Sequence, residues 1–89
     1  MNERVALIEQ HLRNAFAPEY IDIVDDSAAH AGHAGARGGG GHFKVVIVSQ
    51  TFAGKNRLQR HRLVYSALAE LMQNDIHALS IKALAPNEH

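Results

Sequence analysis

The amino-terminal segment has apolar residues at helical spacing. Intervals of three, four and four residues separate the four members of one apolar stripe, Val5, Ile8, Leu12 and Phe16. Polar side chains fill most of the positions between them. This pattern predicts an amphipathic helix. We expect Asn2 to cap its start and Pro18 to prevent its continuation.

Three further segments have the composition or alternation of strands. Residues 20–25 (YIDIVD) are short and rich in β-branched side chains, which predicts a strand. Residues 42–50 (HFKVVIVSQ) give the clearest strand, and their second half is apolar on both faces, so we place this strand at the centre of a sheet. Residues 76–84 (IHALSIKAL) alternate apolar and polar positions and predict the last strand.

A helical region is predicted between the second and third strands. Its apolar stripe consists of Val64, Ala67, Leu68 and Leu71. Asn56 is a candidate cap, and Asn74 and Asp75 close the region. A discontinuity near Arg60 predicts a short helix followed by a longer one.

The order of these elements predicts an α+β fold. A chain of 89 residues has enough length for one modest core, so residues 1–89 form a single domain. The order helix, strand, strand, two helices, strand suits a three-stranded mixed sheet covered by helices on one face. A crossover through the helices makes the last two strands parallel. Residues 85–89 follow the last strand, and we expect them to form a flexible tail.

Composition and motifs exclude several kinds of function. Nine Lys and Arg balance nine Asp and Glu, which argues against nucleic-acid binding driven by bulk charge. There is no cysteine, no apolar run of membrane-spanning length, and no leader-like apolar segment, so we expect a cytoplasmic protein that does not enter a membrane. A phosphate-binding P-loop, a Gly-x-Ser-x-Gly elbow and a His-Glu-x-x-His zinc motif are all absent, and we predict no enzyme.

Residues 27–41 form a long loop rich in glycine and histidine. Fifteen residues between two adjacent strands far exceed the usual hairpin connection. The loop is either a tolerated solvated insertion or a functional segment. It carries His30 and His33, and His77 stands at the start of the last strand. Neutral imidazole is a good ligand for zinc or iron, although a loop histidine is more often simply solvated. A site of two or three histidines also needs further ligands from a partner.

A basic turn precedes and opens the second helical region. Its cations are Lys55, Arg57, Arg60 and Arg62. Positive charge at a helix start opposes the helix dipole, so these residues are candidate contacts for nucleic acid or an acidic partner. The alternative is a solvated turn neutralised by nearby carboxylates. A KH-type Gly-x-x-Gly clamp is incomplete here, because the matching sequence is Gly-Lys-Asn-Arg at residues 54–57.

Several motifs together resemble the BolA family. The stretch RHRLVY at residues 60–65 is similar to its helix signature, and IHAL at residues 76–79 to its final-strand motif. Upstream, Asp-Ser-x-x-His at residues 26–30, HFKV at 42–45 and Phe-x-Gly at 52–54 match the strand, loop and turn portions. The resemblance covers nearly the whole chain. It implies the class II KH-like αββααβ fold, in agreement with the order of elements above.

The resemblance also implies a partner and a cofactor. Proteins of this family pair with monothiol glutaredoxins as heterodimers, and the pair holds a [2Fe-2S] cluster. The glutaredoxin supplies a cysteine and a bound glutathione supplies a second thiolate. The final-strand histidine, here His77, is then a cluster ligand, and the Asp-Ser-x-x-His match makes His30 the ligand from the loop. The loop is longer than the common pattern, so His33 is a rival, and His42 is a candidate supporting residue.

The absence of cysteine agrees with this implied site, because its thiolates come from elsewhere. Replacing thiolate by neutral imidazole raises the reduction potential of such a cluster. The resulting hypothesis is a non-enzymatic adaptor for iron-sulfur cluster trafficking and iron homeostasis. We expect no cluster in the isolated chain, which is a monomer or weak dimer. The alternative implied by the resemblance is a DNA-binding transcriptional regulator of morphology and stress response, with the basic turn as its contact.

Overall fold

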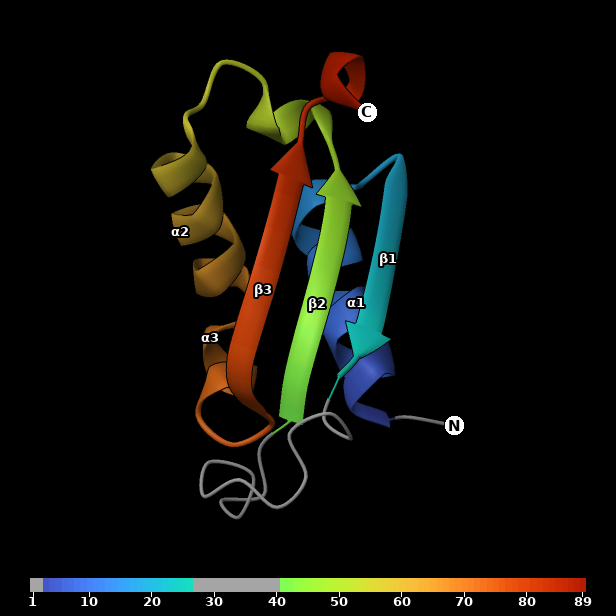
Figure 1. Ribbon diagram of the computed structural model, residues 1–89, viewed down its shortest axis with the longest axis vertical. Coiled ribbons are helices and arrows are strands. Elements are labelled where there is room, and N and C mark those ends of the chain that lie inside the picture. Colours follow the sequence, from blue (N-terminus) through green and yellow to red (C-terminus); the bar gives the residue numbers. More distant parts are fainter. Residues whose placement is uncertain (1–2, 27–40) are drawn as a thin grey trace.

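The computed structural model describes residues 3–26 and 41–89. The elements along this part of the chain are α1 (Glu3–Phe16), β1 (Tyr20–Asp25), β2 (Gly41–Val48), the 3-10 helix η3 (Gln50–Phe52), α2 (Arg57–Ala67), α3 (Ala69–Met72), β3 (Ile76–Leu84) and the 3-10 helix η4 (Pro86–Glu88). Apart from the two 3-10 turns, the order is αββααβ. The α+β class and the order of elements expected from the sequence are confirmed (Figure 1).

The three strands form one mixed sheet in the order β1-β2-β3. β1 pairs antiparallel with β2, and β3 pairs parallel with β2 on its other side. The strand that was predicted to be central is central, and the parallel pair follows from the crossover through α2 and α3. β3 is therefore an edge strand, and α2 and α3 run beside it (Figure 1).

The helices cover one face of the sheet and leave the other face open (Figure 1). Phe43, Val45 and Ile47 of β2 are buried at alternate positions, as the two-residue period of a strand requires. They pack in one core with the apolar stripe of α1 and with residues of the other helices, a cluster that includes Ile8, Leu12, Phe16, Phe52, Val64, Leu68 and Leu71. The intervening positions of β2, beginning with His42 and Lys44, face the open side.

Two predicted boundaries were wrong, and local hydrogen bonds explain both. β2 ends at Val48 instead of residue 50, because the Ser49 side chain caps η3 by accepting a hydrogen bond from the Thr51 N–H. The helical region does not break near Arg60. Asn56 and Gln59 form a capping box that starts α2 at Arg57, so Arg60 lies inside α2. The break comes instead at Leu68, where the backbone leaves helical values (φ −104°, ψ 12°).

The carboxyl-terminal residues 85–89, which we expected to form a flexible tail, include a short helix and several side-chain contacts. Pro86–Glu88 forms the 3-10 helix η4, and the Glu88 carboxylate accepts a hydrogen bond from the Ala85 N–H. The same carboxylate binds Arg60 of α2, and the His89 ring packs against Tyr20 of β1 with ring centroids 5.0 Å apart. These contacts hold the segment against both the sheet and α2.

Candidate functional site

His77 lies at an irregularity where the parallel pairing of β2 and β3 begins. Gly41 is opposite Ile76, but His42 is opposite Ala78, so His77 is the extra residue of a β-bulge. A bulge redirects the side chain of the additional residue relative to the regular pleat. The His77 side chain is exposed, while the preceding Ile76 is buried in the core. The local register thus presents this imidazole to solvent at one end of the sheet.

His42 lies beside His77, although the two residues are 35 positions apart in the sequence. Their ring centroids are 5.1 Å apart and the ring planes are inclined by 48°. His42 is half-buried, whereas His77 is exposed, so the two imidazoles differ in their access to a partner molecule. The structure therefore brings together two of the four histidines that the sequence singled out. The more accessible member of the pair is the one on the final strand.

A small pocket of about 220 Å³ adjoins this pair on β2 and β3. Its lining includes His42 from the middle strand and the residues Ala78, Leu79 and Ser80 from the edge strand. Asp26 and Lys44 line it as well, with the Lys44 ammonium 3.8 Å from the Asp26 carboxylate. The surface next to the histidines is thus concave and has both an acidic and a basic group.

His30 and His33 lie outside the described residues. The described residues on either side of them, Asp26 and Gly41, are both at the end of the sheet where His42 and His77 meet. The backbone N–H of Asp26 donates to the His42 carbonyl at 2.7 Å, and the Gly41 N–H donates to the Asp75 carbonyl at 3.0 Å. Within residues 3–26 and 41–89, no cluster of three or more His, Cys, Asp or Glu side chains could hold a metal ion.

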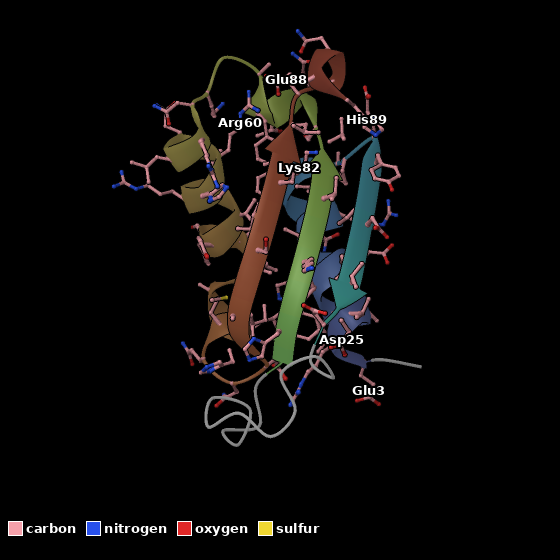
Figure 2. All side chains as sticks on the ribbon, in the orientation of Figure 1. Glu3, Asp25, Arg60, Lys82, Glu88 and His89 are labelled. Atoms are coloured by element: carbon pink, nitrogen blue, oxygen red, sulfur yellow. The ribbon has the colours of Figure 1, made fainter. Side chains whose placement is uncertain are left out.

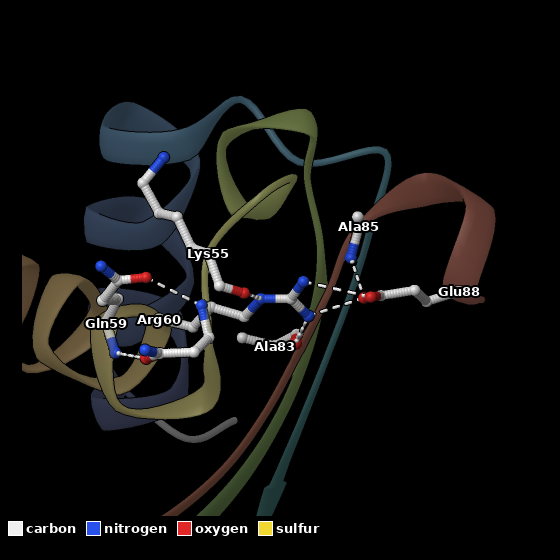
Figure 3. Close-up of polar contacts among 7 residues, drawn as sticks. Lys55, Gln59, Arg60, Ala83, Ala85 and Glu88 are labelled. Atoms are coloured by element: carbon white, nitrogen blue, oxygen red, sulfur yellow. Dashed lines mark hydrogen bonds and ion pairs between the residues drawn. The ribbon is translucent and has the colours of Figure 1, made fainter.

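The basic turn has a different internal organisation from the one expected. Arg60 was a candidate contact for nucleic acid or a partner, but its guanidinium is already engaged within the protein (Figure 3). Nε donates to the Lys55 carbonyl at 2.8 Å, and Nη1 donates to the Ala83 carbonyl at 3.0 Å. Nη1 and Nη2 also bind the two Glu88 carboxylate oxygens, at 2.6 and 3.1 Å. Arg60 therefore joins α2 to β3 and η4.

This ion pair changes the titration of both groups. The hydrogen bond from Arg60, helped by the Ala85 N–H, lowers the pKa of Glu88 to about 2. The same pairing raises the pKa of Arg60 above its ordinary value. A paired carboxylate with a depressed pKa stays ionised at every pH where the protein is expected to work.

The other three cations of the turn are differently placed. Arg57 and Arg62 are exposed on α2, and the Lys55 ammonium donates to the Thr51 carbonyl at 2.8 Å. Arg57 lines a pocket with β3, whereas Lys55 and Arg62 line a separate one. The turn is therefore not a single cationic patch.

Sequence reasoning missed two residues of this region, Lys82 and Glu88. Lys82 alternates with apolar residues along β3 and reads as an ordinary outward-facing polar position, yet it lines the same pocket as Arg57. Figure 2 shows Lys82, Arg60 and Glu88 at the same end of the molecule. No signal in the sequence joins them, because they come from three elements and the contact depends on packing.

No helix in the described part of the chain has both the length and the apolar character needed to cross a membrane.

Comparison with known proteins gives a consistent picture. The sequence model of the family described as BolA-like protein matches residues 12–88. DNA-binding transcriptional regulator BolA from Escherichia coli (strain K12) is 46% identical over 74 residues, which are 83% of this chain and 68% of that protein. BolA-like protein 1 from Mus musculus is 42% identical over 81 residues, which are 91% of this chain but only 57% of the relative.

A solved structure supports the same relationship. The BolA domain of SufE1 from Arabidopsis thaliana superposes with a TM-score of 0.88 and is 37% identical in sequence. The match covers 100% of this chain and 99% of that domain. The described fold is thus that of a BolA domain.

Proposed function

The chain belongs to the BolA-like protein family, and from this premise we propose that it is a non-enzymatic adaptor that pairs with a monothiol glutaredoxin to hold and transfer a [2Fe-2S] cluster. The relatives from Escherichia coli and Mus musculus are named as a transcriptional regulator and a BolA-like protein, and not as enzymes. Membership of this family alone does not distinguish a cluster adaptor from a transcriptional regulator. The adaptor role is carried by the side chains at the bulged end of the sheet.

The observation that supports it is the exposed His77 imidazole next to His42. A mixed cluster site needs an imidazole that a second protein can reach, and His77 is exposed on the strand end. The chain has no cysteine, so it can contribute nitrogen ligands and leaves the thiolates to its partner. The donor set therefore fits a cluster shared between two proteins better than one held by this chain alone.

His77 and His42 have different tasks in this proposal. His77, in its neutral form, offers a ring nitrogen to iron. The His42 ring, half-buried and 5.1 Å away, packs against it and restricts the orientations that His77 can adopt. The bulge adds a second restraint, because the backbone on either side of His77 is paired with β2. An imidazole held this way loses less side-chain freedom when the partner docks. The bound cluster, when present, supplies electron transfer or is itself the delivered cargo.

The second nitrogen ligand remains assigned to the glycine- and histidine-rich segment, with His30 preferred by the family motif and His33 as its rival. Both residues belong to a segment whose two described neighbours lie at the His77 end of the sheet. That placement supports a ligand from this segment.

The test is reconstitution with a glutathione-loaded monothiol glutaredoxin and an iron-sulfur donor. We expect a visible absorption and circular dichroism spectrum that differs from that of glutaredoxin alone. His77→Ala removes the difference, and His42→Phe weakens it while preserving ring packing. The matched control is His11→Ala, because His11 lies on α1, away from the bulge, where its Nδ1–H donates to the Leu7 carbonyl at 2.9 Å.

The same experiment separates the two loop histidines. Loss of the mixed-cluster spectrum in only one of His30→Ala and His33→Ala identifies the loop ligand. If His77→Ala leaves the spectrum unchanged, His77 is not a cluster ligand, and the proposed adaptor role is wrong.

DNA-binding regulation is the second candidate function, and one specific observation favours it. Relatives from Escherichia coli and Vibrio cholerae are named as DNA-binding transcriptional regulators, and they are 46% and 40% identical to this chain. The exposed cations Arg57 and Arg62 on α2 offer contacts to a phosphate backbone. Arg60 is not a suitable test of DNA contact, because its substitution breaks the link to Glu88.

For this candidate, we expect DNA affinity to fall with salt and in Arg57→Ala and Arg62→Ala, with a shallower salt dependence in each variant. Binding that is undetectable or independent of salt would exclude it. Neither outcome of the DNA-binding test changes the expected cluster spectrum, so each candidate function can be confirmed or excluded independently of the other.

A further inference from the structure

A second concave site lies at the opposite end of β3 from His77. It is a pocket of about 270 Å³ between the first turns of α2 and the last residues of the edge strand. Lys82 lies five positions after His77 on β3, which corresponds to about 16 Å along an extended strand. The pocket is thus separate from the histidine pair and from the function proposed for it.

The walls of this pocket are basic. Arg57 and His61 contribute from α2, and Lys82 contributes from β3. Within residues 3–26 and 41–89, none of these three side chains forms an ion pair. The first turn of α2 has no acidic residue to compensate them. In a chain with equal numbers of acidic and basic residues, this local excess of positive charge is a specific feature of the site.

Arg60 provides a rigid fourth group. A guanidinium has five N–H donors, and four hydrogen bonds to Lys55, Ala83 and Glu88 account for four of them. One N–H donor of Arg60 therefore remains, on a guanidinium that already binds the Glu88 carboxylate in a bidentate contact. Because its other bonds fix the guanidinium in place, it requires little reorganisation to meet a further oxygen.

The rest of the lining is apolar. Ile81 and Leu84 are partly buried and Ala83 is buried, so the β3 side of the pocket presents hydrocarbon between the charged groups. A site with charged walls and an apolar floor suits an organic molecule that has an anionic end. A pocket of this size is slightly smaller than most sites for drug-sized ligands, which suits a small molecule.

We propose that this pocket binds a phosphate monoester, with the phosphate between Arg57 and Lys82 and the organic part over Ile81 and Leu84. A monoester has a charge of about −1.5 to −2 at neutral pH, which matches two permanent cations better than a single carboxylate does. The guanidinium of an arginine can bind two phosphate oxygens at once, and the ammonium of a lysine adds a point charge. A small organic phosphate and the 5′-phosphorylated end of a nucleic acid both carry a phosphate monoester, and the experiment distinguishes these two sources.

The test is a titration followed by two-dimensional NMR of the full chain with inorganic phosphate and then with phenyl phosphate, at constant ionic strength. We expect saturable shifts at Arg57, His61 and Lys82, and tighter binding of phenyl phosphate because it covers the apolar floor. Lys82→Gln and Arg57→Gln weaken binding by about tenfold each, the size typical of one charged hydrogen bond. Both side chains are exposed, so neither change should affect folding.

Arg62→Gln is the matched control. Arg62 is an exposed cation on the same helix, but it lines a different pocket, so its loss should leave phenyl phosphate binding unchanged. An equal loss of affinity in Arg62→Gln would indicate diffuse electrostatic attraction and overturn the proposal. Shifts that do not saturate, or that chloride reproduces at the same ionic strength, would also overturn it.

Competition with a short single-stranded oligothymidylate identifies the source of the monoester. Displacement of phenyl phosphate by the 5′-phosphorylated strand alone supports the monoester site and adds a nucleic-acid end to its ligands. No displacement by either strand supports a small-molecule ester. Equal displacement by the 5′-hydroxyl strand shows recognition of the diester backbone and contradicts the proposal.

Discussion

Ser49 is the buried polar residue on which the packing of α1 against the sheet depends. Its side chain is 1% exposed, and it is the sole polar member of the buried set in the described part of the chain. The Ser49 hydroxyl donates to the Phe16 carbonyl at 2.8 Å, across 33 residues, and accepts from the Thr51 N–H at 3.2 Å. It thus provides a hydrogen-bond donor for a carbonyl in the last turn of α1 and also caps η3. We predict that Ser49→Ala destabilises the fold measurably.

The magnitude follows from these two bonds. Each intramolecular hydrogen bond contributes about 1 kcal/mol net, and a buried acceptor left unsatisfied costs about 1–3 kcal/mol. The Phe16 carbonyl loses this partner at a buried site, while the Thr51 N–H lies near the surface and regains water. We therefore expect a loss of about 2 kcal/mol in the free energy of unfolding, mostly from the Phe16 contact.

Urea unfolding followed by circular dichroism measures this loss. With a slope of about 1–2 kcal/mol per molar urea for a small domain, the midpoint should fall by about 1–2 M. Ser66→Ala is the matched control, because Ser66 is exposed on α2 and its loss should change stability by less than about 0.5 kcal/mol. A similarly small change in Ser49→Ala would refute the reasoning, and so would a change that alters the slope instead of the midpoint.

Three further predictions concern stability and pH. Ala17 has a left-handed backbone (φ 44°) at the end of α1, so Ala17→Gly should raise the free energy of unfolding by about 0.5–1 kcal/mol, measured by urea unfolding; a loss would contradict the strain. Leu12→Ala should cost about 2–5 kcal/mol in the same assay, because Leu12 is completely buried, and a cost below 1 kcal/mol would show that the core collapses around the gap. The pKa of Glu88 is lowered to about 2 from an ordinary 4.5, so its pairing with Arg60 stabilises the fold above pH 4.5 and is lost as pH falls towards 2. The melting temperatures of wild type and Glu88→Gln should therefore converge over that interval, and parallel curves would contradict the assignment.

The sequence alone determined the fold class and the main elements. The stripe ending at Phe16, the two-residue alternation around Val45 and the stripe through Val64 are each local patterns, and each is buried as expected. Their order then limits the topology, because a strand that returns through helices beside the central strand must run parallel to it. The resemblance of residues 60–65 and 76–79 to one family is likewise a property of short segments, and it identified the family correctly.

Only the tertiary structure decided which side chains meet. His42 and His77 approach each other because the β2–β3 register skips one residue, and no pattern within either strand encodes that skip. In the sequence, Arg60 is one cation among several, but in the structure it forms an ion pair with Glu88, 28 residues away. Lys82 joins Arg57 only because the edge strand packs beside α2. Periodicity reports which face of an element is buried, whereas register and packing angle set the partners of that face, and these depend on contacts between residues far apart in the chain.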